Sequence, residues 1–263
     1  MRRSPIALLA ILFALPLTAG AESRSLAEIE QCVRDNLPRK SSVQTVALRS
    51  TNRVGDVSES IATIHWMSFE DGLSKLLLRF VRPLDMRGAG VLLLEKEDRS
   101  PDTFLYLPEV GQVRRVSSGA AASSLFGTDF SYEDFNRLVG MSGETTKELG
   151  DDTEISGRGA HVISARPSPE SGSAYERIAI AVDKETCVVL QTQSYEPGDR
   201  LRKVLLADPA EIKHVGSLWL PHRFTMQDLR DETKTDVIVE EIEVEARIHR
   251  KMFSARELEA GAR

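Results

Sequence analysis

The chain has 263 residues, of which 28% are charged and 41% are hydrophobic, and its formal net charge is -6. Acidic and basic residues are interspersed along it, which argues against a nucleic-acid-binding surface and against a polybasic patch for membranes. No repeat period or low-complexity tract stands out, and the length fits one all-β domain or two small domains.

A signal peptide is predicted over residues 1–21. It begins with two arginines, continues as an apolar run over residues 6–17 and ends in the small residues 19–21. The apolar run is too short to span a bilayer as a mature helix. Cleavage after Ala21 removes two positive charges, which changes the net charge from -6 to -8, and yields an exported chain.

The first predicted helix begins at a capping box of Ser25 with Glu28, and Pro38 stops it. Its apolar residues share one face, as in a helix that packs on a core. They are Leu26, Ile29, Val33 and Leu37.

Most of the remaining chain indicates short β-strands, rich in β-branched and aromatic residues and broken by Gly, Pro, Asp and Ser clusters. Because they follow one another without intervening helices, we expect antiparallel meanders and not a parallel sheet. The predicted strands are residues 43–53, 60–69, 73–82, 88–95, 103–107, 112–117, 145–153, 158–166, 175–183, 187–195, 201–213, 217–229 and 233–248. Residues 118–144 are the one long interval without a strand.

The register of one hairpin can be predicted. A two-residue Asp71-Gly72 loop mixes apolar and charged residues on one face, whereas a three-residue loop of residues 70–72, with Gly72 left-handed, gives an apolar face. We therefore predict the second register. It pairs Trp66 with Leu76, Ile64 with Leu78 and Ala62 with Phe80.

Residues 103–135 hold six of the fifteen aromatic residues of the chain. Two interpretations stay open, a surface that holds an apolar ligand and an ordinary core between a hairpin and a helix. The helix is predicted to begin at Ser131, capped with Asp134, and Phe130 is expected to pack on Phe135. A third, short helix is expected after Ser254.

Cys32 and Cys187 are the two cysteines of the chain. An exported protein with an even number of cysteines is a candidate for a disulfide bond, and we predict that these two residues are joined. Cys32 lies at the margin of the apolar face of the first helix, so the bond would tie this helix to a distant strand. The alternative is a pair of buried free thiols.

Four sequence blocks carry a resemblance to a known family. They are PLDMRG at residues 83–88, FLYLP at 104–108, VRRV at 113–116 and GTDFSYEDF at 127–135. In this order and spacing they resemble the outer-membrane lipoprotein-sorting protein family, which is similar to the periplasmic carrier LolA. Phe104 stands where that family is expected to have tryptophan.

This resemblance implies a mainly β fold, a LolA/LolB-like unclosed antiparallel β-barrel with a few covering helices, as a single domain over residues 22–263. It also implies an apolar cavity for acyl chains and a periplasmic location. The partners that it implies are an inner-membrane transporter of the RND/MMPL type and an outer-membrane acceptor.

The cavity is expected on the apolar face of the hairpin and around the aromatic segment. The candidate lining residues are Ile64, Trp66, Leu76, Leu78, Phe80, Phe104, Tyr106, Leu125, Phe126 and Phe130. Small residues over 119–124 would let the covering segment move when cargo enters. The alternative is that the same residues close on one another as solid core.

Arg114 and Arg115 are candidates for contact with a lipid headgroup or a protein partner. As neighbours on a strand they point to opposite faces, so one could meet Asp129 or Glu133 while the other faces solvent or a headgroup. The alternative is a pair of ordinary surface arginines.

These features favour a periplasmic carrier that binds lipid or lipoprotein acyl chains and passes them between membranes. The alternative function is a periplasmic lipid or lipoprotein sensor that regulates a membrane partner. Catalysis is not expected, because the common hydrolase, metalloprotease, phosphate-loop and dinucleotide motifs are absent from the sequence. The histidines are scattered, and we expect neither a metal nor a cofactor.

Overall fold

The computed structural model describes residues 24–97, 99–141 and 143–261. The predicted signal peptide lies outside these residues. The α-helices of the described part are α1 (Leu26–Asp35), α2 (Tyr132–Leu138) and α3 (Ala255–Ala260). Short 3-10 helices are η1 (Ser118–Ala120), η2 (Pro169–Ser171), η3 (Pro209–Glu211) and η4 (Arg250–Met252).

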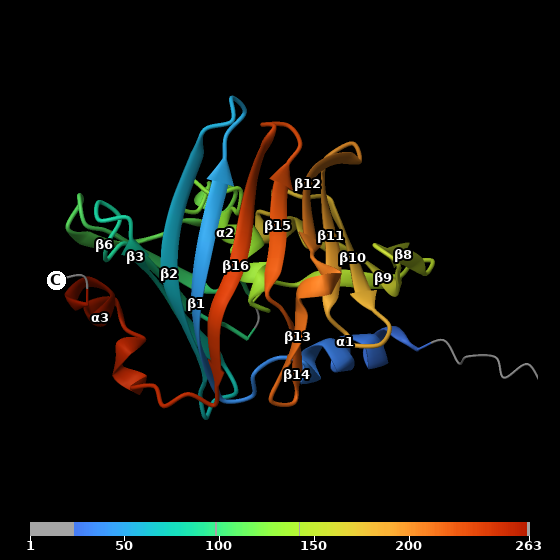
Figure 1. Ribbon diagram of the computed structural model, residues 1–263, viewed down its shortest axis with the longest axis horizontal. Helices are drawn as coiled ribbons and strands as arrows, with labels where there is room; N and C mark the ends of the chain where they lie inside the picture. The colour runs from blue at the N-terminus through green and yellow to red at the C-terminus, as the bar shows by residue number, and fades with distance from the viewer. Residues whose placement is uncertain (1–23, 98, 142, 262–263) are drawn as a thin grey trace, which may run out of the picture.

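One large antiparallel sheet forms the body of the molecule (Figure 1). Its strands are β1 (Ser41–Thr51), β2 (Val57–Ser68), β3 (Ser74–Arg82), β4 (Gly90–Leu94), β5 (Asp102–Leu107), β6 (Gln112–Arg115), β7 (Thr145–Leu149), β8 (Thr153–Ile155), β9 (Arg158–Pro167), β10 (Arg177–Asp183), β11 (Val189–Glu196), β12 (Arg200–Ala207), β15 (Arg223–Asp228) and β16 (Thr233–Val244). A separate hairpin joins β13 (Ile212–Val215) to β14 (Leu218–Pro221).

The sheet does not close into a barrel. Its strand order is β6-β5-β4-β3-β2-β1-β16-β15-β12-β11-β10-β9-β7, with β8 also paired to β9. The edge strands β6 and β7 are consecutive in the sequence but lie at opposite ends of the sheet. The predicted fold class, an unclosed antiparallel half-barrel with a few covering helices, is therefore confirmed.

Three of the predicted strands are each divided in two. The run 145–153 is interrupted at Gly150, the run 201–213 at Asp208 and Pro209, and the run 217–229 after Pro221. Asp208 caps η3 by accepting a hydrogen bond from the backbone N–H of Ala210. Proline lacks the N–H that a strand ladder requires, which explains the last two interruptions.

The hairpin of β2 and β3 has the predicted register. Trp66 is paired with Leu76, Ile64 with Leu78 and Ala62 with Phe80. Gly72 has a φ of 80°, the left-handed conformation that the three-residue loop requires. Because side chains alternate along a strand, this register places one apolar set on the concave face of the sheet.

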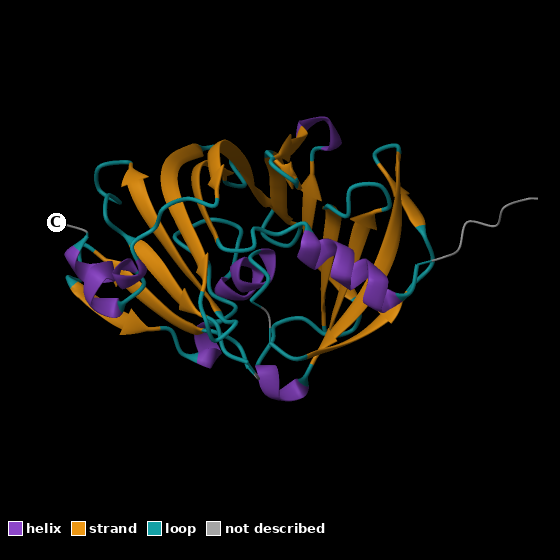
Figure 2. Ribbon diagram, turned by 90° about the horizontal axis from the view of Figure 1, so that it is seen from below, coloured by secondary structure: helices purple, strands orange, loops and turns teal. Residues whose placement is uncertain are grey.

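Helices α2 and α3 lie on opposite faces of the sheet. Figure 2 shows α2 within the curve of the sheet and α3 outside it. On the concave side, Phe130, Tyr132 and Phe135 pack in one large core with residues of β2, β3 and β4. On the convex side, Leu258 of α3 packs with Leu77 and other residues of a smaller core.

Helix α1 has the predicted capping box of Ser25 with Glu28, and it ends at Asp35, before the expected stop at Pro38. Its buried residue Ile29 packs with Ile163, Val182 and neighbouring residues of β9 to β11. Figure 1 shows α1 across the lower end of these strands.

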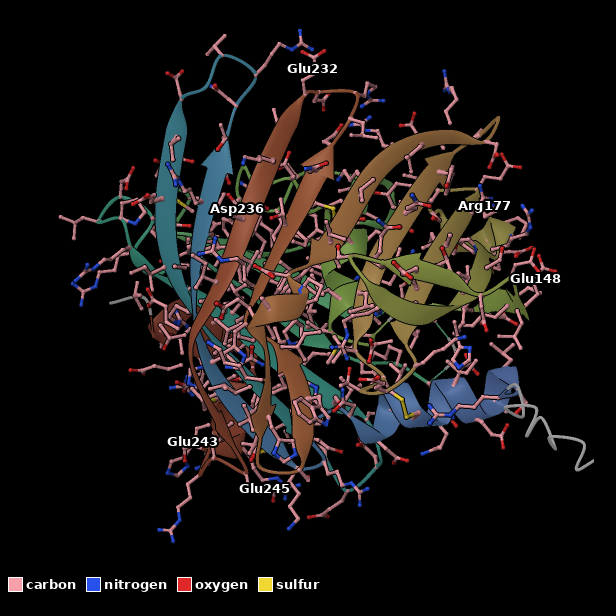
Figure 3. All side chains as sticks on the ribbon, turned by 45° about the vertical axis from the view of Figure 1, so that its right-hand side comes forward. Glu148, Arg177, Glu232, Asp236, Glu243 and Glu245 are labelled. Atoms are coloured by element: carbon pink, nitrogen blue, oxygen red, sulfur yellow. A yellow bond between two sulfur atoms is a disulfide. The ribbon has the colours of Figure 1, made fainter. Side chains whose placement is uncertain are left out.

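The outer surface of the molecule is highly charged. Figure 3 shows Glu243 and Glu245 near the lower end of β16, with Glu232 at its upper turn. Asp236, also on β16, receives a hydrogen bond from Thr225. Side chains alternate between the two faces of the sheet along β16. The charged ones face the solvent on the convex side, and apolar ones such as Val237 and Val239 pack in the concave core.

Candidate functional site: an apolar cavity under helix α2

An apolar cavity of about 420 Å³ lies between the concave face of the sheet and α2. Strands β1 to β3, β15 and β16 supply its floor, and α2 with the residues before and after it supplies its cover. The lining is mainly Leu, Ile, Val and Phe side chains. The cavity is therefore suited to hydrocarbon, which gains about 0.8 kcal/mol for each CH₂ group that leaves water.

Seven of the predicted cavity residues lie along this cavity. They are Ile64, Trp66, Leu76, Leu78, Phe80, Leu125 and Phe130. The first five belong to the β2–β3 hairpin, so the alternation of its strands brings them together. Leu125 and Phe130 come from the segment before α2, where the backbone N–H of Leu125 donates to the carbonyl of Phe130.

Phe104 and Tyr106 do not line the cavity, and their assignment to it is corrected. They lie on the convex face, where they pack with Leu92 and with Phe253 and Leu258 near the C-terminus. The register explains this placement, because β5 pairs Phe104 with Leu92, whose side chain lies in the same convex cluster. The sequence indicated the alternation of β5 but not which side α3 covers.

Phe126 also stays outside the cavity lining. Its ring packs edge-on against Phe80, with 4.7 Å between the ring centroids, and its backbone has a φ of 52°. It therefore packs against a lining residue within the concave core and is not itself part of the lining. Nearby, the backbone N–H groups of Tyr132 and Glu133 donate to the carbonyls of Ser123 and Ala121, in the segment that was expected to move.

A buried polar network fixes the start of α2 to the sheet. Asp134 completes the predicted capping box with Ser131 and is almost fully buried. Lys203 Nζ lies 2.8 Å from Asp134 Oδ2, and the Tyr175 hydroxyl donates to Oδ1 at 2.8 Å. Burial, and then the negative charge of Asp134, raises the pKa of Tyr175. No sequence motif indicates Lys203 or Tyr175, because they meet Asp134 only in the folded chain.

A second apolar cavity of about 200 Å³ adjoins the first on the side of β10 to β12. Phe130 and Phe224 line both cavities and meet edge-on, with ring centroids 6.4 Å apart. Leu205 and Met226 line the second cavity only. The interior under α2 thus has two apolar compartments with a shared aromatic wall.

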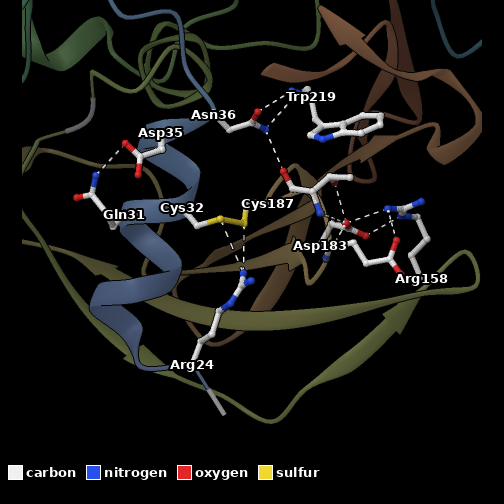
Figure 4. The surroundings of a disulfide bond; sticks show 11 residues. Arg24, Gln31, Cys32, Asp35, Asn36, Arg158, Asp183, Cys187 and Trp219 are labelled. Atoms are coloured by element: carbon white, nitrogen blue, oxygen red, sulfur yellow. Dashed lines mark hydrogen bonds and ion pairs between the residues drawn. A yellow bond between two sulfur atoms is a disulfide. The ribbon is translucent and has the colours of Figure 1, made fainter. Parts of the chain in front are cut away.

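The cavities reach the surface between the ends of α1 and α2 and strand β14. Leu37 and Leu138, which line both cavities, are 39% exposed, and Trp219, which lines the second, is 40% exposed. Asn36 holds this region together, because its Nδ2 donates to the Trp219 carbonyl at 2.7 Å and its Oδ1 accepts from the Trp219 N–H at 2.6 Å (Figure 4). We call the region of Leu37, Leu138 and Trp219 the mouth.

The predicted disulfide joins Cys32 and Cys187, whose Cα atoms lie 5.8 Å apart (Figure 4). It connects α1 to the turn between β10 and β11. Asn36, one helical turn after Cys32, also donates a hydrogen bond to the Thr186 carbonyl at 3.2 Å. Together these bonds hold the C-terminal end of α1 beside the mouth.

Arg114 and Arg115 lie on β6, away from the lining of both apolar cavities. Arg115 pairs with Asp102, not with Asp129 or Glu133, the two expected partners. Asp129 instead accepts hydrogen bonds from Thr233 and Thr235. Glu133 pairs with Arg137 at 2.7 Å. A hydrogen bond from Arg99, with further hydrogen bonds from Arg115 and Lys96, lowers the pKa of Asp102 to about 2. Arg115 and Asp102 border a separate polar pocket of about 500 Å³.

Within residues 24–97, 99–141 and 143–261, no helix has the length and apolar character needed to cross a membrane. In the same described residues, no group of three or more His, Cys, Asp or Glu side chains is placed to hold a metal ion.

Comparison with known proteins yields a family and a fold. A family model with the description "Uncharacterized protein" matches residues 72–260, more than half of the chain. No curated protein matches the sequence.

Solved structures provide the fold. A protein domain described as an outer membrane lipoprotein-sorting protein, from Vibrio parahaemolyticus, aligns with a TM-score of 0.79 at 22% identity over 88% of this chain and 97% of that chain. A DUF1329 family protein from Desulfovibrio piger aligns with a TM-score of 0.80 at 20% identity over 88% and 95%. A LolA superfamily protein from Nitrosomonas europaea aligns with a TM-score of 0.66 at 16% identity over 88% and 98%. The fold is LolA-like.

Proposed function

Because the chain belongs to the family whose model matches residues 72–260 and has a LolA-like fold, we propose that it is a periplasmic carrier of lipid or lipoprotein acyl chains. The cargo would occupy the apolar cavity under α2 and pass from one membrane to another. The cavity of about 420 Å³, with its apolar lining, is the observation that carries this proposal.

The basis of binding is the hydrophobic effect. An acyl chain in the cavity leaves water and covers Ile64, Trp66, Leu76 and Leu78, and it needs no strong polar contact to remain there. Such binding does not involve covalent chemistry, which agrees with the proposal that the protein is not an enzyme. The predicted signal peptide over residues 1–21 supports the periplasmic location.

The proposed partners are an inner-membrane transporter of the RND/MMPL type, which would load the carrier, and an outer-membrane acceptor. The family resemblance of the sequence supports them. Arg114 and Arg115 are exposed on the outer strand β6 and remain our candidates for contact with a protein partner. The single continuous sheet supports one domain over residues 22–263.

Lipid binding by the cavity can be tested with neighbouring residues of β2. Ile64 lines the cavity and pairs with Leu78, whereas Thr63 precedes it and pairs with Arg79 on the other face. Both are partly buried. We expect native mass spectrometry of the protein purified from the periplasm to show bound lipid, and Ile64→Asp to abolish it because a carboxylate would face the cargo.

The matched variant Thr63→Asp is expected to retain the lipid of the unmodified protein, and circular dichroism establishes that each variant is folded. A folded Ile64→Asp variant that still carries its full complement of lipid would contradict the cavity as the cargo site. An unmodified protein without lipid, also after incubation with phospholipid vesicles, would contradict the carrier function itself.

A further inference from the structure

One cationic side chain lines the main apolar cavity. Among the described residues that surround this cavity, the charged ones are Arg34, from the last turn of α1, and Glu95, which follows β4. Glu95 is already engaged, because its Oε2 accepts a hydrogen bond from the backbone N–H of Ser74 at 2.6 Å. Arg34 is the only guanidinium in the lining.

Arg34 has no carboxylate partner among residues 24–97, 99–141 and 143–261. Its described hydrogen bonds go to the neutral Gln31, whose Oε1 lies 3.3 Å from Nε and 2.9 Å from Nη2. By contrast, Arg39 pairs with Asp35 at 3.6 Å. Arg34 therefore retains its full positive charge and free N–H donors at the edge of an apolar volume.

The position of Arg34 relates it to the mouth. Arg34 and Leu37 both line the main cavity, and the backbone N–H of Leu37 donates to the Arg34 carbonyl at 3.1 Å, so Arg34 lies beside the mouth. A cation in the last turn is also favoured by the helix dipole, which explains why the charge is stable there. The dipole does not explain why this side chain borders the cavity. The disulfide and Asn36 keep this end of α1 in place.

We propose that Arg34 binds the anionic headgroup of a phospholipid whose acyl chains fill the cavity. This inference rests on the proposed carrier function and specifies its cargo. A guanidinium presents N–H donors in a planar fork that matches phosphate oxygens, and such charge-assisted bonds are stronger than neutral ones. With the chains inside and the headgroup at the mouth, an amphiphile satisfies both the apolar lining and the unpaired cation.

The experiment uses the fluorescence of Trp66, which lines the cavity. Trp219→Phe provides a background in which Trp66 is the only tryptophan, since the chain has two. The protein is mixed with vesicles of phosphatidylglycerol or of phosphatidylcholine, both with brominated acyl chains that quench a tryptophan in contact with them. The lipid concentration at half-maximal quenching is measured for each.

We expect phosphatidylglycerol to quench at a lower concentration than phosphatidylcholine. Arg34→Glu should raise the midpoint for phosphatidylglycerol about two- to fivefold, the range for an ionic contact near the surface, and leave that for phosphatidylcholine unchanged. Glu95→Gln should lower the midpoint for phosphatidylglycerol, because it removes the opposing carboxylate. Arg39→Glu, which makes the same charge change on a residue outside the cavity lining, is the control and should change neither midpoint.

Two outcomes overturn the inference. Equal midpoints for both lipids, unaltered by Arg34→Glu, would remove the headgroup assignment and leave the carrier function intact. A complete lack of Trp66 quenching by either lipid would remove the carrier function, and this inference with it.

Discussion

Asp183 is a single residue that organises the turn carrying Cys187. Its side chain is 1% exposed and receives two hydrogen bonds from Arg158, at 2.6 and 2.9 Å (Figure 4). Its Oδ1 also accepts from the backbone N–H of Thr186 at 2.7 Å and from that of Glu185 at 3.1 Å. The carboxylate therefore replaces backbone partners that this tight turn does not supply.

The ionisation of Asp183 predicts a dependence of stability on pH. Burial opposes the charged form, but hydrogen bonds from Arg158 and Thr186 outweigh burial and lower the pKa of Asp183 from 3.8 to about 2. Since the pKa is lower in the folded state, this carboxylate stabilises the fold above its unfolded pKa, and the stabilisation is lost as the pH falls from 3.8 to about 2.

We therefore expect Asp183→Asn to destabilise the protein at neutral pH and to reduce the loss of stability on acidification. Urea unfolding midpoints over this pH range provide the measurement. Asp199→Asn is the control, because Asp199 pairs with Arg177 at an exposed position and should leave the acid dependence unchanged. Parallel pH profiles for the unmodified protein and Asp183→Asn would show that this carboxylate does not contribute.

At the scale of elements, the three described helices that pack on the sheet come from the start, the middle and the end of the chain. α1 precedes all strands, α2 lies between β6 and β7, and α3 follows β16. Each is short, so its stability in the protein depends on packing and on covalent or polar attachment to the sheet. For α1 the attachment is the disulfide, and for α2 it is the contact of Asp134 with Lys203 and Tyr175.

The disulfide is expected to contribute substantially to stability. Cys32 and Cys187 are 155 residues apart, and for a loop of this length the chain-entropy model gives a stabilisation of about 4 to 5 kcal/mol. The double variant Cys32→Ser with Cys187→Ser should lose a free energy of unfolding of this order in urea titrations. A loss within the error of the measurement would contradict the prediction.

Thiol labelling tests the bond itself. The denatured, unreduced protein should contain no reactive cysteine, and two reactive thiols should appear after reduction. Labelling of both cysteines without reduction would exclude the bond in the purified protein.

For the whole molecule, the open sheet leaves a cavity that its own side chains do not fill. A closed small barrel packs its interior solid, whereas here the ends at β6 and β7 stay apart and α2 covers the gap over the concave face. An interior of this type can take up and release cargo through the mouth. A carrier and a sensor would share this cavity, but a carrier passes its cargo on, whereas a sensor retains it.

Transfer between vesicles tests the carrier against the sensor. We expect the protein to move a fluorescent phospholipid from donor to acceptor vesicles at a rate proportional to protein concentration. Ile64→Asp should reduce the rate to that of vesicles alone, while Thr63→Asp should retain it. Lipid that binds but never reaches the acceptor vesicles would favour the sensor.

The sequence by itself determined the local features of this protein. The capping boxes at Ser25 and Ser131 and the left-handed Gly72 depend on neighbouring residues only, and they occur as predicted. The alternation of apolar residues in the β2–β3 hairpin determined its register for the same reason. The order of four sequence blocks was sufficient to indicate the LolA-like fold.

Tertiary structure decided what depends on residues far apart in the chain. Phe104 and Tyr106 face away from the cavity because α3 buries the convex side of β5, and alternation along a strand does not tell which of its two faces receives a helix. Arg34 borders the cavity, and Lys203 reaches Asp134, because the curved sheet brings their elements together. A pattern of neighbours predicts the elements, but the surroundings of each side chain follow only from the packing of those elements.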